Sequence, residues 1–507
     1  MAREFVSCDR GQLLLMPPSV VEWLPGDHLV WTVLGAVEAM DLRRFSEHYR
    51  LGAAGRAPYD PAMLVALLLY AYARGVRSSR GIERACWEDV GFKVITTMRT
   101  PDHSTIAEFR RRHELEIAEL FDDVLGLCRE AGLVSVGVIT IDGTKIKANA
   151  SMDQNRSYRQ VVTEILREAE ETDRREDELY GDARGDELPE QLRTPEGRRQ
   201  ALADAKQRIQ ERKGRAGTET QDATDEHVAV DPQQSVTGNG RREWFRIARR
   251  ELEDHRERER RPIARDRDDR LLDAADRLEQ NHQVQLSTNE AYERWRAAAR
   301  DRRGRRMHAN NTKPFEPPVL PEGTVNLSDP DSRVMRTQGT PPRQAYNAQA
   351  VVNDRQIILA AQVTVSAADF GQLEPMLDTT LQALDRHGVT DRPEVVLADA
   401  GYWHTTQMQA ITDRGIEVLA PPDGNMRHGP RPGWEHGPYQ QMREKLSTDR
   451  GRELYAQRKI TIEPIFGQIK HNRRIDRFMR RGRAAAQSEW RLVTATHNLL
   501  KLVCHER

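Results

Sequence analysis

The sequence predicts an α/β protein in which a sheet-containing domain is interrupted by a mainly helical, charged insertion and preceded by an all-α domain. Three observations lead to this prediction. Residues 25 to 132 carry punctuated helical patterns, apolar β-branched segments follow at 133 to 141 and again from 345, and the stretch between them is charged and interrupted by prolines. The predicted boundaries are 1–132 for the helical domain, 133–151 and 331–507 for the α/β domain, and 152–330 for the insertion.

The helical domain is predicted from its start and stop signals. Asp60 is a good N-cap, Pro61 suits the first helical position, and Gly75 ends the apolar run that follows. Ser78 or Ser79 is expected to cap the next helix, and Ser104 a later one. A final amphipathic helix is expected to end at Gly132.

A basic segment lies inside this domain. The residues Arg110, Arg111 and Arg112 adjoin His113 near the end of a predicted helix. A compact helical domain with a basic helix is compatible with helix-turn-helix DNA binding, although a plain helical bundle has the same pattern. We interpret residues 1–132 as a DNA-binding domain.

The α/β domain is predicted from the order of its elements. Leu133 to Ile141 has the composition of a strand, and after the insertion come further elements in a fixed order: strands at 345–352 and 356–365, a helix at 371–384, a strand at 395–398, a helix at 405–413, a strand at 416–420, and helices to the end. This order, β, β, β, α, β, α, β, α, is the ribonuclease-H-like arrangement. In it the first and fourth strands are neighbours.

The insertion contains two helical patches at a spacing of three and four residues. One includes Trp244, Ala248 and Leu252, and the other runs from Leu271 to Leu278, which together suggest a helical hairpin or short coiled coil. Between them, Arg256 to Arg270 alternates arginine with acids. We interpret that run as a solvated helix face, with contact to nucleic acid as the alternative.

Three carboxylates are the candidate catalytic and metal-binding residues. Asp142 and Asp399 each follow a β-branched strand and stand before or near a glycine, where an open sheet presents side chains to a ligand. Glu463 opens a later helix, because Pro464 is tolerated only in the first turn. Three such groups would hold two Mg²⁺ ions for in-line attack on a phosphodiester, and Mn²⁺ is expected to substitute.

A basic run follows Glu463 and favours a polyanionic partner. Lys470 lies seven residues on and is expected to share the face of Glu463. The run contains a single acid, Asp476, and its basic members are Lys470, Arg473, Arg474, Arg477, Arg480, Arg481 and Arg483. Lys145, close to Asp142, is a further candidate for contact with a DNA backbone.

At these residues the sequence resembles the DDE-type transposases of bacterial insertion sequences. Their Tyr, Arg, Glu, Lys signature is filled by Tyr455, Arg458, Glu463 and Lys470. The interval from Arg458 to Glu463 is one residue longer than the family pattern, and Lys459 stands at the expected spacing, so the role of the arginine is open between Arg458 and Lys459. The resemblance covers about 25–150 and 326–505, including Ile-Asp-Gly-Thr-Lys around Asp142 and the segment from Tyr346 to Gln349.

The resemblance implies a metal-dependent transposase that binds terminal inverted repeats, cleaves at the element ends and joins them to target DNA. Tyr455, Arg458 or Lys459, and Lys470 would contact phosphates or the terminal base. Because such enzymes hold two ends, a homodimer or larger synaptic complex is expected. Two alternatives remain open at this point: an inactive, DNA-binding relic, and a metal-dependent nuclease that does not join strands.

Composition restricts the cellular setting more than the activity. Lys plus Arg (78) nearly equals Asp plus Glu (79), so net charge says nothing about nucleic acid. The four cysteines are scattered without a Cys-x-x-Cys pair, which argues against a zinc ribbon or a disulfide framework. No leader and no apolar run of transmembrane length is found, so the sequence predicts a soluble, cytoplasmic protein.

Overall fold

The structure is a computed structural model that describes residues 19–47, 58–167, 240–259, 263–264, 266–298, 316–337, 339–424 and 433–506. Much of the predicted insertion, including 168–239, lies outside the described residues. Within the described residues no helix is both long and apolar enough to cross a membrane.

The described N-terminal part is helical. Its α-helices are α1 (Leu29–Ala39), α2 (Arg43–Ser46), α3 (Pro61–Ala73), α4 (Ser79–Glu88), α5 (Val90–Ile95), α6 (His103–Arg112) and α7 (Glu114–Glu130). The predicted caps Asp60 and Ser78 are confirmed, because each side chain accepts a hydrogen bond from the first turn of its helix. The prediction for Ser104 was wrong: Asp102 caps α6, accepting from Thr105 N at 2.8 Å, and Ser104 lies inside the helix.

The sheet has the strand order that the sequence predicts. Its strands are β1 (Val138–Lys147), β4 (Arg333–Met335), β5 (Arg343–Asn353), β6 (Ile358–Thr364), β7 (Val395–Leu397) and β8 (Glu417–Leu419). They run β6-β5-β1-β7-β8, and β4 pairs with the start of β5. The β6-β5-β1 pairings are antiparallel and the β1-β7-β8 pairings parallel, so the first and fourth main strands are neighbours.

Strand β1 is longer than predicted and is displaced toward the C-terminus. The prediction that Asp142 closes the strand was wrong, because Asp142 pairs with Ala350 and Gly143 with Gln349 inside the β1-β5 ladder. The pairing with β5 continues to Lys147 and carries the backbone straight through the glycine. Asp142 therefore sits on a rigid strand.

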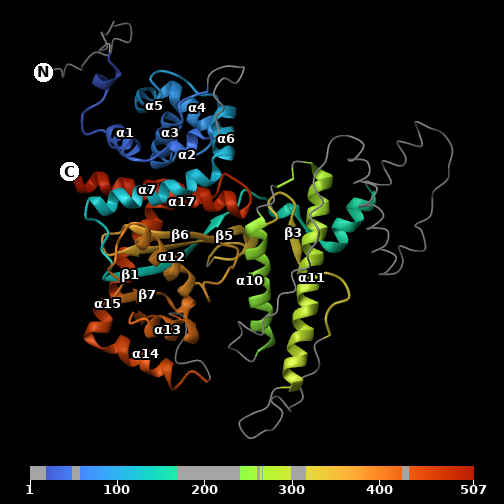
Figure 1. Cartoon of the computed structure of the whole chain (residues 1–507). Helices are drawn as coiled ribbons and strands as arrows, with labels where there is room; N and C mark the ends of the chain where they lie inside the picture. The colour runs from blue at the N-terminus through green and yellow to red at the C-terminus, as the bar shows by residue number, and fades with distance from the viewer. Residues whose placement is uncertain are drawn as a thin grey trace, which may run out of the picture.

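Helices cover both faces of the sheet. Helices α12 (Leu373–Arg386) and α13 (Thr405–Asp413) lie on one face, and α17 (Arg483–Glu506) crosses the other beneath α7 (Figure 1). Helix α17 is held to the strands by buried polar contacts. The Trp490 indole donates to Gln349 O at 2.9 Å, and the Asn498 side chain exchanges two 2.8 Å hydrogen bonds with the backbone of Ile358. The N-terminal helices stack on this layer through α3.

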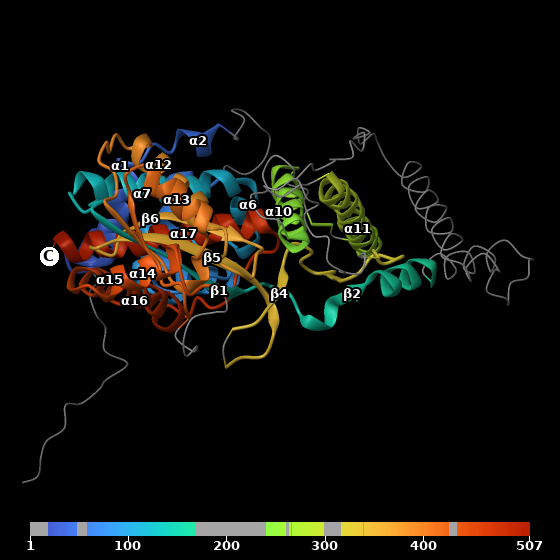
Figure 2. The same ribbon diagram turned by 90° about the horizontal axis from the view of Figure 1, so that it is seen from below.

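The described part of the insertion lies beside the sheet (Figure 2). It contains α10 (Arg241–Glu259), α11 (Arg267–Ala298), the short strands β2 (Asn155–Ser157) and β3 (Thr324–Asn326), and a helical stretch at 158–167. The predicted patches lie on α10 and α11, which pack against each other. Their buried residues form small clusters apart from the main core, around Trp244, Ala248 and Leu271.

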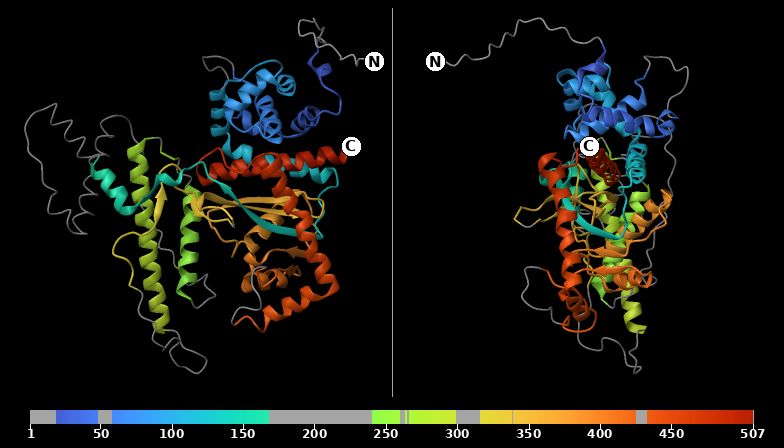
Figure 3. Two further views of the ribbon diagram at one scale, coloured as in Figure 1. Left: turned by 180° about the vertical axis from the view of Figure 1, so that it is seen from behind. Right: turned by 90° about the vertical axis from the view of Figure 1, so that its left-hand side faces the viewer.

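The C-terminal helices run along the parallel edge of the sheet (Figure 3). Helix α14 (Pro438–Ser447) is followed by α15 (Asp449–Thr461), α16 (Glu463–Gly467) and one π-helical turn (Gln468–Asn472). Helix α15 contacts β7 and so passes the end of the strand that precedes Asp399. As predicted, Glu463 and Pro464 lie in the first turn of α16.

Candidate functional site

The register of the sheet brings Asp142 and Asp399 to the same level. Thr140 on β1 is paired with Leu397 on β7, and each aspartate lies two residues further along its parallel chain. Asp399 also caps the short 3₁₀ helix Ala400–Tyr402, its Oδ1 accepting from Gly401 N at 2.8 Å. Two carboxylates 257 positions apart in the sequence thus face one site.

Arg458 on α15 connects Asp142 with Glu463. Its Nη1 donates to Asp142 Oδ2 at 2.8 Å, and its Nη2 lies 3.5 Å from Glu463 Oε1. Lys459, one residue on, is exposed on α15. The structure therefore brings Arg458 to the carboxylates and leaves Lys459 in solvent. Tyr455 lies one turn before Arg458 on α15, and burial raises the pKa of the Tyr455 phenol.

The site carries more negative than positive charge. Asp142 is only 15% exposed, and burial together with the neighbouring Asp399 raises its pKa to about 7, although Arg458 opposes the shift. Burial also raises the pKa of Asp399. With Glu463 and Asp369, four carboxylates share this region with two cations, Arg458 and Lys145. Such an excess favours binding of cations.

Asp369 is a site residue that the sequence prediction missed. It lies in the loop between β6 and α12, and its Oδ1 accepts from Asn347 Nδ2 at 2.7 Å, Gln349 Nε2 at 2.8 Å and Lys145 Nζ at 3.3 Å. A signal was present: Asn347 and Gln349 are polar residues in a buried strand and need a buried partner.

Gly143 is required by this arrangement. A Cβ at that position would lie 2.2 Å from Gln349 Nε2 and 2.7 Å from Asp369 Oδ1. Any side chain would push apart the contacts that hold Asp369. The Asp-Gly pair at 142 and 143 is thus explained by packing within a strand and not by a turn.

Lys470 follows α16 and contacts strand β1. The segment from Gln468 to Asn472 is a π-helical turn, which rotates Lys470 relative to a continuous α-helix. Its Nζ donates to Lys145 O at 3.0 Å, and burial lowers its pKa. Glu463, with a side chain 52% exposed, stays at the Arg458 end of the site.

The predicted DNA-contacting arginines divide into two groups. Arg474 and Arg477 are exposed. Arg473 is only 6% exposed, and its guanidinium donates to the carbonyl oxygens of Tyr72 and Val493. Burial lowers the pKa of Arg473 to about 9. A side chain enclosed in this way cannot contact DNA in this conformation, so Arg473 is a structural residue that joins α3 to α17.

The donor chemistry at this site suits a divalent metal. In the described part of the chain no three Asp, Glu, His or Cys side chains converge closely enough to form a ready metal-binding group, because Arg458 stands between Asp142 and Glu463. However, all the candidate donors are hard carboxylate or amide oxygens, and Asn347 Oδ1 is buried there without a hydrogen-bond partner among the described residues. The side chains of Asp142, Asp399 and Glu463 fit a divalent cation once Arg458 releases the Asp142 and Glu463 carboxylates.

Comparison with known families agrees with this geometry. A transposase domain model matches residues 18–112, and a transposase DDE domain model, which implies a ribonuclease-H-like fold, matches residues 327–499. No curated protein and no solved structure gives a match. The two matched regions are the helical N-terminal part and the portion of the sheet domain that supplies Asp399, Arg458 and Glu463. The chain therefore belongs to the DDE-type insertion-sequence transposases.

Proposed function

We propose that this transposase binds the ends of an insertion sequence, cleaves DNA there with the aid of divalent metal ions, and transfers the 3′-hydroxyl end to target DNA. The observation that carries the proposal is the meeting of Asp142 and Asp399 at one level of the sheet, with Arg458 connecting them to Glu463. Family membership supplies the reaction class, and the site supplies the residues.

The proposed roles follow from the contacts. Asp142, Asp399 and Glu463 would hold the metal, taken to be two Mg²⁺ with Mn²⁺ as a substitute, which when bound activates the attacking oxygen and stabilises the leaving one. Asp369 orients Lys145 and the amides of β5 beneath them. Arg458 would exchange its carboxylate partners for a phosphate when DNA and metal enter, since its guanidinium is suited to both.

The proposed DNA contacts extend from this site. Tyr455 and Lys145 lie next to the carboxylates, and Lys470 donates to the carbonyl oxygen of Lys145. Arg474 and Arg477 continue outward along the basic segment. Residues 1–132 are proposed as the domain that recognises the terminal repeats. Because two ends must be held together, we propose that a dimer or larger assembly is the active form.

A plasmid assay tests the function. A supercoiled plasmid carrying the terminal sequences that flank this coding region should be nicked in Mg²⁺ by the wild-type protein and then joined to a labelled target. Replacing Asp142, Asp399 or Glu463 singly with alanine should abolish nicking while binding to the ends persists. Glu453→Ala, an exposed glutamate on the neighbouring helix α15, is the matched control and should nick normally.

Each contrary outcome of the assay has a distinct meaning. Nicking without joining would identify a nuclease that does not transfer strands. Binding without nicking by the wild-type protein would identify an inactive relic. Loss of end binding in all three carboxylate variants would mean that these residues maintain the fold and are not catalytic.

A further inference from the structure

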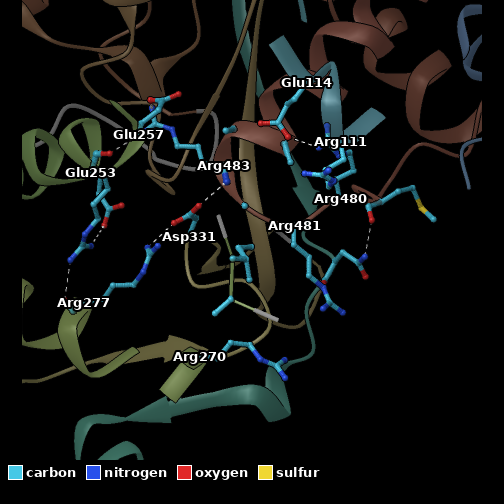
Figure 4. Close-up of a pocket in the computed structure, with 18 residues that line it drawn as sticks. Arg111, Glu114, Glu253, Glu257, Arg270, Arg277, Asp331, Arg480, Arg481 and Arg483 are labelled. Atoms are coloured by element: carbon cyan, nitrogen blue, oxygen red, sulfur yellow. Dashed lines mark hydrogen bonds and ion pairs between the residues drawn. The ribbon is translucent and has the colours of Figure 1, made fainter. Parts of the chain in front are cut away.

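A cavity of about 760 Å³ lies where three parts of the chain meet, away from the carboxylates (Figure 4). One wall comes from the junction of α6 and α7, another from α10 and α11 of the insertion, and the third from the segment 479–485 that leads into α17. The predicted insertion therefore contributes directly to a cavity shared with the N-terminal helices and the basic C-terminal segment.

The lining is dominated by arginine. Seven arginines and four acidic residues face the cavity. The acids are already used in holding the walls together: Asp331 pairs with Arg277 at 2.7 Å, and Glu257 with Arg483 at 2.7 Å. Glu253 pairs with Arg256 at 3.1 Å, and Glu114 pairs with Arg480. The Glu257–Arg483 pair links the insertion to the C-terminal segment, and the Glu114–Arg480 pair links α7 to it.

Two of the remaining arginines have no acidic partner in the described part of the chain. Arg481 donates through Nε to Asn149 O at 3.1 Å, and Arg270 donates through Nε to Asp266 O at 3.1 Å. A third, Arg111, is paired only within its own helix, with Glu108, and its side chain is 61% exposed. The terminal nitrogens of Arg270 and Arg481 keep their capacity to bind phosphate oxygens.

The stretch of chain from Asp142 to Asn149 gives the distance between the carboxylates and the cavity. Asn149, which accepts from Arg481, lies seven residues after Asp142 on β1 and its extended continuation, where Ala148 N still donates to Gln344 O. Seven residues of extended chain span roughly 23 Å. At about 3.4 Å per base pair, this distance is about seven base pairs of duplex.

Basic groups lie along the path between the two places. Lys145 pairs with Asp369 at 3.3 Å, and Lys470 donates to the carbonyl oxygen of Lys145 at 3.0 Å. The segment that carries Arg477 runs beside the end of β1, where Phe478 N donates to Lys147 O at 2.8 Å. The basic segment 470–483 therefore runs from the site toward Arg481, and Asp476, the acid within it, pairs with Lys147 at 2.6 Å.

We propose that the arginine-lined cavity, through Arg270 and Arg481, binds the phosphate backbone of the DNA duplex about seven base pairs from the position of cleavage, so that the insertion serves as a second DNA clamp. This inference rests on the proposed function, because it takes the carboxylates as the point of cleavage. It assigns a role to α10 and α11 of the insertion, which neither matching family model covers.

The test measures binding of a series of duplexes. Each carries one terminal sequence of the element, and the arm on one side of the cleavage position is lengthened from 2 to 20 base pairs; a second series lengthens the other arm. For the wild-type protein, affinity should rise when one arm passes about seven base pairs. In R270A/R481A this rise should be lost, with affinity for the longest duplex about tenfold lower and the salt dependence weakened by about one unit of slope per arginine.

A matched control and a rescue keep the outcome clear. Arg355 is exposed, donates to a single backbone carbonyl, Gly132 O at 3.1 Å, and lies at the opposite end of the sheet, so R355A should keep the rise. R270K/R481K, which restores the charge, should recover most of it. An unchanged rise in R270A/R481A, or equal loss in R355A, would overturn the clamp.

The two proposals fail in different ways. If the wild-type protein neither binds nor nicks end-bearing DNA, the proposed function is wrong. If it nicks normally but neither series shows the rise near seven base pairs, only the clamp is wrong.

Discussion

The guanidinium of Arg458 donates to Asp142 Oδ2 at 2.8 Å and reaches Glu463 Oε1 at 3.5 Å. The Arg458 guanidinium lies between two carboxylates of the proposed metal site, whose negative charges stabilise its positive charge. The contact favours Arg458 over Lys459 as the signature arginine, since Lys459 is exposed.

Replacing Arg458 should therefore have a far larger effect than replacing its neighbour. We expect R458A to reduce Mg²⁺-dependent nicking by about 100-fold or more, because the planar guanidinium that meets the phosphate is lost. R458K should recover only part of the rate. K459A is the control and should stay within about threefold of wild type, as an exposed side chain outside the site. Equal losses in the two alanine variants would contradict the assignment.

Asp369→Asn should impair catalysis with little effect on folding. The amide keeps the shape of the side chain but removes the charge that holds Lys145 and the amides of Asn347 and Gln349. We expect nicking to fall by about 10- to 100-fold, and the Mg²⁺ concentration needed for half-maximal nicking to rise. Asp378 on α12, half-exposed and paired with Arg414 away from the site, provides the control D378N. An unchanged Mg²⁺ requirement in D369N would mean that Asp369 only supports the loop.

The raised pKa of Asp142 predicts how stability changes with pH in the absence of metal. Folding favours the protonated carboxyl, so this contribution to the free energy of unfolding is complete below the ordinary pKa of 3.8 and is lost as pH rises through about 7. D142N cannot ionise. We expect D142N to be more stable than wild type at pH 8 by on the order of 2–4 kcal/mol, with little difference at pH 4.

Urea unfolding of the metal-free proteins, followed by tryptophan fluorescence from pH 4 to 8, measures this difference. Added Mg²⁺ should stabilise wild type more than D142N at pH 8, because a bound cation compensates the buried charge. Parallel stability curves for the two proteins would show that Asp142 ionises without cost in the folded state.

Arg473 and Arg474 are adjacent but should respond differently to substitution. R473A leaves the carbonyl oxygens of Tyr72 and Val493 without their donor, and we expect a loss of about 2–4 kcal/mol in the free energy of unfolding. R474A removes an exposed side chain and should leave stability within about 0.5 kcal/mol while weakening DNA binding. Thermal unfolding and a gel-shift assay separate the two. A stable R473A that binds DNA weakly would restore the original prediction for Arg473.

Local patterns in the chain were sufficient for most elements of the sheet domain. The order of strands and helices from Leu133 onward and the caps at Asp60 and Ser78 follow from turn chemistry and periodicity, which act over a few residues. The neighbouring position of β1 and β7 also followed, because few topologies accommodate that order of elements.

Other features depend on contacts between distant segments. For these the sequence pattern gave a wrong prediction or none. β1 continues past Gly143 because β5 pairs with it, and Arg473 is buried because the carbonyl oxygens of α3 and α17 enclose its charge. Asp369 enters the site because polar residues of β5 need a partner.

The three carboxylates and the basic run were evident in the chain as residue types at favourable positions. Their electrostatics were not evident, since the pKa of Asp142 and the pairing of Arg458 with Asp142 result from burial and from distances across the folded molecule. Side-chain identity is local, whereas desolvation and charge pairing arise only when the strands and α15 come together.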